Sequence, residues 1–323
     1  MLFDIRHRTQ YDYQPAVRES VMELWVQPQQ SARQRLTKFA IELEPAAQLF
    51  SYADYFGNAV YHFDVPQAHE RLTIQSSASL ESGQPAPLPD SLEPGEWSLL
   101  RQGKVADQHF DFLHPHGFTV PTKALATFIH KHHIAPLVAA DPLTAVRALC
   151  RRLYQALDYE PGFTAADSPI DHALIAGSGV CQDFAHVMIA ICRGWDVPAR
   201  YVSGYLFTDA SAGDRSAPDA THAWVEVFLP SLGWIGLDPT NDVAAGERHI
   251  VVAIGRDYSD VPPSRGVYKG EAESELTVDV MVRRASAEAI GPEFVRTARP
   301  AVSSTGQRLP SSAALDQLLQ QQQ

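Results

Sequence analysis

Three residues in the second half of the chain have the types that nucleophilic catalysis requires: Cys181, His222 and Asp238. A cysteine nucleophile needs a base that takes and returns its proton, and the base needs a polar group that orients its ring. Each of the three stands at the predicted end of a helix or strand, where functional side chains are often exposed. The pattern predicts a thiol nucleophile with a histidine base.

Cys181 is expected in the first turn of a buried helix. The segment that contains it reads GSGVCQDFAHVMIAICRGW, and its glycines at 177 and 179 predict a flexible turn. Backbone N–H groups at a helix N-terminus stabilise anions, so a thiolate is favoured at this position. The apolar residues that follow at helical spacing predict one buried face, before Gly194 ends the helix: Phe184, Val187, Met188, Ile191 and Cys192.

His222 and Asp238 are expected on two strands of one hairpin, over residues 222–229 and 234–242. A four-residue turn over 230–233 would place His222 opposite Asn241 and Asp238 opposite Val225. Asp238 then lies within about three residues of His222 along the ladder, at roughly 3.4 Å per residue, and a hydrogen bond between them is feasible.

Other residues compete for two of these roles. His186 lies on the predicted helix of the nucleophile but points away from it at helical spacing, so His222 is preferred as the base. Glu226 and Asp242 compete with Asp238 as the group that orients the imidazole. In an ideal hairpin, Asp242 would lie closer to His222 than Asp238 does, and spacing alone leaves this choice open.

The positioning elements fall into compositionally distinct regions. Residues 1–82 alternate between apolar and polar over 3–13, 20–28, 35–45, 59–66 and 71–81, which predicts a small β-sandwich of two packed sheets. Residues 83–97 are rich in proline and predict a linker. Helical periodicity then begins, and strand-like runs follow it over 199–207, 222–229 and 234–242. The polar tail, residues 285–323, predicts a mobile extension.

Composition limits the classes of protein that this chain could be. It has 323 residues, 45% hydrophobic and 20% charged, which excludes a disordered chain, a coiled coil and a fibre. The net charge of −12 argues against general nucleic-acid binding. The sequence contains no run of 18 or more consecutive apolar residues, which is the length that a membrane span requires. Three sparse cysteines, without a signal-peptide pattern, predict a reducing compartment, and we expect a cytoplasmic protein.

The remaining cysteines and the clustered histidines are expected to have structural roles. Cys150 and Cys192 lie on apolar helical stripes and are predicted to be buried packing residues. Two groups of histidines occur in HFDFLHPHGF and IHKHH, but neither has the helical i, i+4 pair of a metalloprotease. We therefore predict neither a metal nor a cofactor, and we interpret these residues as surface or packing histidines: His109, His114, His116, His130, His132 and His133.

The segments around the three candidate residues resemble the core of the bacterial transglutaminase-like superfamily. The resemblance is carried by GVCQDFAHVMIAICRGWDVPARYVSGYL and HAWVEVFLPSLGWIGLDPTND, and GRDYSDVPPSRGVYKG resembles the segment that follows in that family. The run from Asp54 to Asn58 resembles the β domain that precedes the core. The resemblance extends to about residue 284 and implies that residues 98–284 form the catalytic core. It implies a papain-like α+β core and a triad at Cys181, His222 and Asp238, because Asp238 lies in the matching Asp-Pro-Thr block.

The resemblance also implies a reaction. In this family a thiolate attacks a carboxamide or peptide carbonyl and forms a thioester acyl-enzyme, which water or an amine then resolves. We expect hydrolysis of a peptide or protein substrate, as by a cysteine protease or amidase. The alternatives are transglutaminase-type transfer to an amine and a catalytically idle module that binds a peptide.

Four further residues are candidates for contact with the substrate. The backbone N–H of Cys181 is a natural donor to an oxyanion, and Tyr159 is the candidate for the second donor. Gln182 and Asp183 could contact substrate or cap the helix. Trp224 could form a wall of the cleft or belong to the core.

Overall fold

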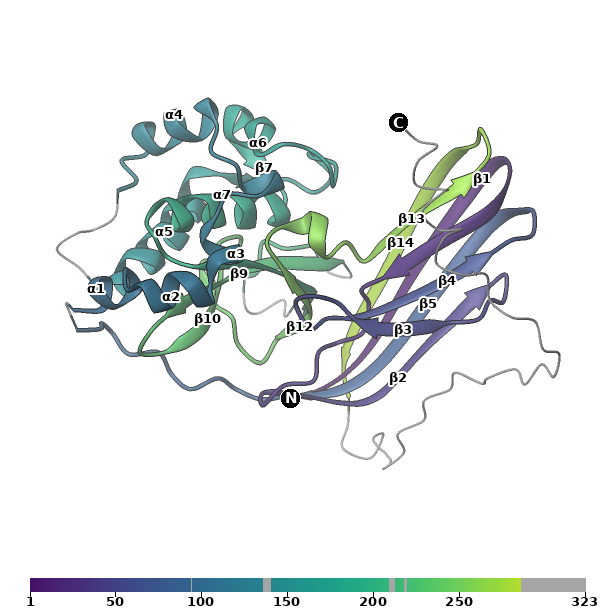
Figure 1. The fold of residues 1–323 in the computed structure, drawn as a ribbon, viewed down its shortest axis with the longest axis horizontal. Helices are drawn as coiled ribbons and strands as arrows, with labels where there is room; N and C mark the ends of the chain where they lie inside the picture. The colour runs from purple at the N-terminus through teal and green to yellow at the C-terminus, as the bar shows by residue number, and fades with distance from the viewer. Residues whose placement is uncertain (94, 136–140, 209–212, 218–219, 286–323) are drawn as a thin grey trace.

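The computed structural model describes residues 1–93, 95–135, 141–208, 213–217 and 220–285, which form a β domain and a helix-rich core (Figure 1). The tail predicted to be mobile lies, from residue 286 onward, outside the described residues. In the predicted linker, residues 83–93 have no helix or strand, and the first helix begins at Glu96. The strands of the β domain are β1 (Leu2–Leu24), β2 (Gln34–Glu44), β3 (Phe50–Ala53), β4 (Ala59–Val65), β5 (His69–Ser82), β13 (Ser264–Lys269) and β14 (Glu273–Arg284).

β1 is the central strand of the β domain and belongs to two ladders. Its first half pairs with β5 and β14, and its second half pairs with β4 and β13, all antiparallel. The sequence predicts two strands here, whereas the structure forms one that changes partners between Gln14 and Ser20. The apolar core of this domain combines both halves of β1 with β4 and β5: Tyr13, Val17, Met22, Leu24, Val26, Phe63, Val65, Leu72 and Ile74.

The last two strands differ from the predicted domain division. Residues 264–284 are expected in the catalytic core, but β13 and β14 pair with β1 in the β domain. The chain thus enters the core after β5 and returns to the β domain after it. Alternation of polar and apolar residues predicts a strand but not its partner, and these partners lie more than 200 residues apart in the chain.

The core packs helices against an antiparallel sheet of order β11-β10-β9-β8-β12. α7 (Cys181–Gly194) lies against β8 and β9, and α5 packs against α7. Among the described helices, none combines the length and the apolar composition that a bilayer-spanning helix requires. The other elements are α1 (Glu96–Leu100), α2 (Gly103–Gln108), α3 (Phe110–Leu113), η1 (Gly117–Thr119), α4 (Lys123–Lys131), α5 (Pro142–Ala156), β6 (Asp158–Tyr159), α6 (Ile170–Ala176), β7 (Ser178–Gly179), β8 (Ala199–Leu206), β9 (Thr221–Leu229), β10 (Gly233–Asp238), β11 (Val243–Ala244), β12 (His249–Gly255) and η2 (Tyr258–Asp260).

The β9–β10 hairpin has a register one residue from the predicted one. Gly233 pairs with Leu229 and Leu237 pairs with Val225, so Asp238 does not oppose Val225. The reason is local: Gly233 has φ +74° and joins the ladder, which shortens the loop to residues 230–232. A slip of one residue changes which side chains share a face of the sheet. The register is set by the conformation of the turn, which the alternation of residues in the strands does not reveal.

Two side-chain amides join the β domain to β12, which lies between the two parts of the molecule in Figure 1. Gln34 accepts the N–H of Val251 through Oε1 (2.9 Å) and donates to its carbonyl through Nε2 (2.8 Å). Asn58 does the same for Ile254, with both distances 2.8 Å. These amides hydrogen-bond β12 as a further strand would.

We expect Asn58→Ala to lower the free energy of unfolding by about 2–4 kcal/mol, because it leaves the backbone N–H and C=O of Ile254 buried without a partner. Asn58 is fully buried, and its amide also bonds Asp54 and Gln29. Urea unfolding measures the change, with the exposed Gln67→Ala as the matched control. A loss equal to that of the control would show that Asn58 does not stabilise this interface.

Candidate active site

Cys181 is the first residue of α7, as the glycine turn and the periodicity predict. Asp183, three residues beyond the N-cap, accepts the backbone N–H of Val180 (2.8 Å) and the hydroxyl of Thr164 (2.5 Å). Asp183 is buried, and of its two predicted roles the structure shows helix capping. A side chain at Gly179 would meet the Asp183 carboxylate at 2.8 Å, so a glycine is needed there.

Gln182 holds a loop against the start of α7. Its Nε2 donates to the carbonyl of Ala166 (2.7 Å), while its side chain lines the cavity beside Cys181. The same loop contains Thr164, which bonds Asp183. The two residues after the nucleophile therefore build one wall of the site.

His222 and Asp238 are buried side by side at the ends of β9 and β10. Nε2 of His222 lies 2.8 Å from Oδ2 of Asp238. A carboxylate can only accept, so Nε2 carries the hydrogen and the other ring nitrogen, Nδ1, remains for other partners. Nδ1 lies 3.4 Å from the hydroxyl oxygen of Ser216, and His222 lines the same cavity as Cys181. His222 thus contacts the carboxylate and shares a cavity with the thiol.

The electrostatics of this pair favour a charged imidazolium. Burial alone lowers the pKa of His222, but the negative charge of Asp238, its hydrogen bond to the ring and the charge of Cys181 outweigh this effect and raise this pKa to about 10. Burial likewise raises the pKa of Asp238, but His222 and His249 overcome it and hold the pKa well below its usual range. Asp238 is therefore a carboxylate at neutral pH.

The competing residues lie elsewhere. Asp242 bonds the guanidinium of Arg151 (3.0 Å), and Glu226 pairs with Arg200 (2.6 Å). His186 is fully buried between the rings of Phe118 and Tyr201, each 5.0 Å away. Asp238 rather than Asp242 contacts His222, although the ideal hairpin would favour Asp242.

Neither aromatic candidate, Tyr159 or Trp224, is among the described residues that line the cavity beside Cys181. The hydroxyl of Tyr159 accepts the backbone N–H of Ala217 (3.2 Å), and burial and the nearby charge of Cys181 raise its pKa. The hydroxyl therefore keeps its proton. Trp224 is buried behind His222, with ring centroids 6.0 Å apart, and does not line the cavity beside Cys181. Its place is in the core.

A cavity of about 230 Å³ opens beside Cys181 and His222. Tyr201 lines it from β8; its side chain is buried, and its hydroxyl forms no hydrogen bond with any described residue. No carboxylate is among the described residues of the cavity wall. The wall is completed by Thr164, Ala165, Ala166, Val180, Gln182, Ser203, Thr221, Ala223, Tyr258 and Pro263.

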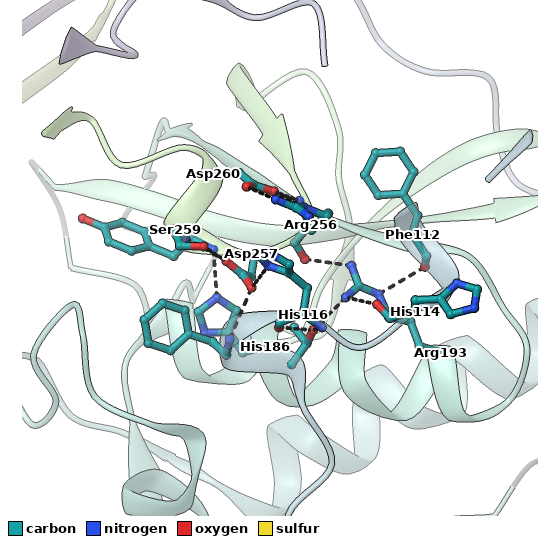
Figure 2. Close-up of polar contacts among 12 residues, drawn as sticks. Phe112, His114, His116, His186, Arg193, Arg256, Asp257, Ser259 and Asp260 are labelled. Carbon is teal, nitrogen blue, oxygen red and sulfur yellow. Dashed lines mark hydrogen bonds and ion pairs between the residues drawn. The ribbon is translucent and has the colours of Figure 1, made fainter. Parts of the chain in front are cut away.

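One wall of this cavity rests on a buried polar network (Figure 2). Asp257 is fully buried, and its carboxylate accepts from Nδ1 of His116 (2.8 Å) and from the N–H and hydroxyl of Ser259 (2.8 and 2.5 Å). The next residue, Tyr258, donates its N–H to Nε2 of His186 (3.1 Å) and lines the cavity. The network thereby fixes the position of Tyr258.

Arg193, near the end of α7, holds the adjoining backbone in Figure 2. Burial lowers its pKa to about 10, so the guanidinium is charged at neutral pH. The sequence does contain a signal for this role of Arg193, namely a charged residue at the end of an apolar helix, but it was not used in the prediction. The pairing of His116 with Asp257 was not predicted either. The groups that accept from Arg193 are the carbonyls of Phe112, His114, Ala199 and Arg256 and the hydroxyl of Thr119.

Two residues around Asp238 were also missed: Asn241 and His249. Asn241 lies in the same block as Asp238 and donates to its Oδ2 (2.7 Å). Nε2 of His249 lies 3.2 Å from that oxygen. The ligand atoms of His222, Asp238 and His249 lie within 4.8 Å of one another, as in a metal site. The side-chain amide of Asn241 donates to the same oxygen, Oδ2 of Asp238, so hydrogen bonds explain why these side chains lie so close together.

Comparison with known proteins identifies the family of this chain. The family described as the bacterial transglutaminase-like N-terminal region matches residues 3–81, and the transglutaminase-like superfamily matches residues 134–239. Uncharacterized protein ML0607 of Mycobacterium leprae is 36% identical over 287 residues, which are 86% of this chain and 97% of that protein. Uncharacterized protein Rv2569c of Mycobacterium tuberculosis is 36% identical over 297 residues, covering 87% and 91%.

A partial relative and a solved structure extend the comparison. Part of the protein-glutamine gamma-glutamyltransferase of Pseudomonas aeruginosa is 32% identical over 159 residues, which cover 46% of this chain and 23% of that enzyme. The crystal structure of a candidate cysteine protease from Cytophaga hutchinsonii has the same fold, with a TM-score of 0.67, 18% identity and coverage of 93% and 95%. The chain therefore belongs to the bacterial transglutaminase-like superfamily, with that family's N-terminal β domain followed by its core.

Proposed function

We propose that this protein is a thiol-dependent hydrolase of peptide or other carboxamide bonds, with Cys181, His222 and Asp238 as its catalytic triad. The observation that carries the proposal is the position of His222, which hydrogen-bonds Asp238 through Nε2 and lines the same cavity as Cys181. In this proposal, His222 holds the proton of the thiol and Asp238 stabilises the resulting imidazolium.

The reaction follows from these contacts. The sulfur of Cys181 attacks the carbonyl carbon, and the carbonyl oxygen becomes an oxyanion at the start of α7, where the backbone N–H of Cys181 donates to it. Tyr159 is proposed as the second donor, because its oxygen already accepts from Ala217 and its own hydrogen can point elsewhere. His222 then protonates the leaving amine. A thioester remains, and water activated by His222 releases the acid.

Water is the proposed acceptor because the cavity wall offers nothing that would select an amine. A transferase must select an amine over water, and a carboxylate near the thioester would attract the ammonium form before it loses its proton to His222. None lines this cavity among the described residues. The second candidate, transfer to an amine, is favoured by the similarity to protein-glutamine gamma-glutamyltransferase.

Incubating the protein with a peptide library and with casein, each with a labelled primary amine in 18O water, is expected to give acids that carry 18O and no amine label. Mass spectrometry of the products measures both outcomes, with Cys181→Ala as the blank. Incorporation of the labelled amine into the product would show that the reaction is acyl transfer and not hydrolysis. Binding of peptides without turnover, equal in Cys181→Ala, would instead identify an idle binding module.

A further inference from the structure

The carboxylate of Asp238 is held by five hydrogen bonds. Oδ1 accepts the backbone N–H groups of Thr240 (3.0 Å) and Asn241 (3.3 Å). On Oδ2, three side-chain groups converge: Nε2 of His222 at 2.8 Å, Nδ2 of Asn241 at 2.7 Å and Nε2 of His249 at 3.2 Å. His222 comes from β9, which pairs with the strand of Asp238, whereas His249 comes from β12 at the far edge of the sheet.

The hydrogen bonds of His249 determine its tautomer. The backbone N–H of Gly246 donates to Nδ1 of His249 (3.2 Å), so Nδ1 carries a lone pair. The ring hydrogen is then on Nε2, where it points to Asp238. Burial lowers the pKa of His249, although Asp238 opposes this effect, and the ring is neutral at neutral pH.

His249 is held rigidly in this position. It is buried, and its ring meets that of Trp224 edge to face, with centroids 5.2 Å apart. β12 pairs with β8 along its length, and the β domain hydrogen-bonds it through Gln34 and Asn58. The donor therefore cannot follow Asp238 if the carboxylate rotates.

We propose that His249 is a positioning residue, whose neutral imidazole fixes the Asp238 carboxylate so that Oδ2 faces His222. The inference rests on the proposed function of the triad. A neutral donor suits this role, because a second cation beside Asp238 would compete with the imidazolium of His222 for the same negative charge. It also gives the β domain a role, since that domain secures the strand that contains His249.

Several charged groups surround this pair and bear on any pH measurement. Asp238, His222 and Arg248 act on His249, and Asp238 and Cys181 act on His222. Arg33 and Glu226 line a small pocket with His249 and Trp224. They are unchanged in the variants below, so a difference between those variants arises at position 249.

Two matched variants test the proposal. His249→Phe keeps a ring against Trp224 but removes the donor, whereas His249→Gln keeps an N–H near the position of Nε2 but removes the ring. His249→Phe is expected to lower kcat about 10–100-fold, the effect of losing a hydrogen bond to a charged group, with KM nearly unchanged. His249→Gln is expected to recover most of this loss.

A second readout needs no substrate. The alkylation of Cys181 by iodoacetamide, followed against pH, reports the titration of the thiol–imidazole pair. In His249→Phe the alkaline part of this profile is expected to move to lower pH, because a mobile carboxylate stabilises the imidazolium less. In His249→Gln the profile stays close to that of the unchanged protein.

The outcomes separate this inference from the proposed function. If Cys181 in the unchanged protein reacts no faster than a free thiol, the proposed triad is wrong. If it is activated and His249→Phe has the same pH profile and kcat, the positioning role is wrong. Equal losses in both variants, including a shared loss of thermal stability, would assign His249 to packing and overturn the proposal as well.

Discussion

Cys181→Ala is expected to abolish turnover, with kcat at least about 10⁴-fold below that of the unchanged protein. Cys181 is the one thiol among the described residues that line the cavity with His222, and its negative charge acts on the pKa of that histidine. Without the thiol no thioester forms, and oriented water alone gives little rate. Initial rates on any peptide substrate found by the library measure the loss.

The other two cysteines supply the controls, because both are buried on apolar helix faces. Burial raises the pKa of Cys192 to about 12 and that of Cys150 well above its ordinary value, so both remain thiols. Iodoacetamide is therefore expected to label Cys181 alone in the folded protein, and Cys192→Ala should retain activity. Activity that survives in Cys181→Ala would exclude the thiol mechanism.

Asp238→Asn is expected to lower kcat about 10⁴-fold while changing the fold little. The amide is nearly isosteric with the carboxylate but lacks its charge. The pKa of His222 should then fall from about 10, because burial continues to lower it and the opposing charge is gone. The alkaline limb of the alkylation profile for Cys181 should move to lower pH.

Stability should change with a definite sign. The raised pKa of His222 stabilises the fold fully below its ordinary value of 6.5, and this contribution is lost as pH rises toward about 10. The lowered pKa of Asp238 stabilises the fold above its ordinary value of 3.8, and this contribution is lost as pH falls below that value. Urea unfolding should therefore show the largest difference between the unchanged protein and Asp238→Asn from about pH 4 to 6.5.

Asp242→Asn is the matched control for this experiment. Asp242 lies four residues away and bonds Arg151 at the surface, so its charge does not reach His222 through a hydrogen bond. We expect unchanged kcat and a stability change within about 0.5 kcal/mol. If Asp242→Asn were the more damaging substitution, the assignment of Asp238 would be wrong.

Local patterns in the sequence predicted the elements that carry the site. Glycines followed by helical periodicity placed Cys181 at the start of a helix, and the structure has that helix from Cys181 to Gly194. Alternation around His222 predicted the strand that β9 forms. Both features depend on backbone preferences over a few neighbouring residues, which is the information that a sequence displays directly.

The choice of Asp238 came from its resemblance to a family motif, not from spacing. The predicted register was one residue out, because the conformation of Gly233 decides the length of the loop. His249 could not be predicted at all, since β12 reaches Asp238 only when it pairs with β8 and is held by Gln34 and Asn58.

Neighbouring residues were sufficient to predict the helix start at Cys181, the strand of His222 and the chemical types of the three candidate groups. The folded core was needed to show that Asp238 meets His222, which donors hold its carboxylate, and that β13 and β14 return to β1. The physical reason is range: helix and strand formation depends on adjacent residues, whereas these contacts join segments brought together by burial of the whole core.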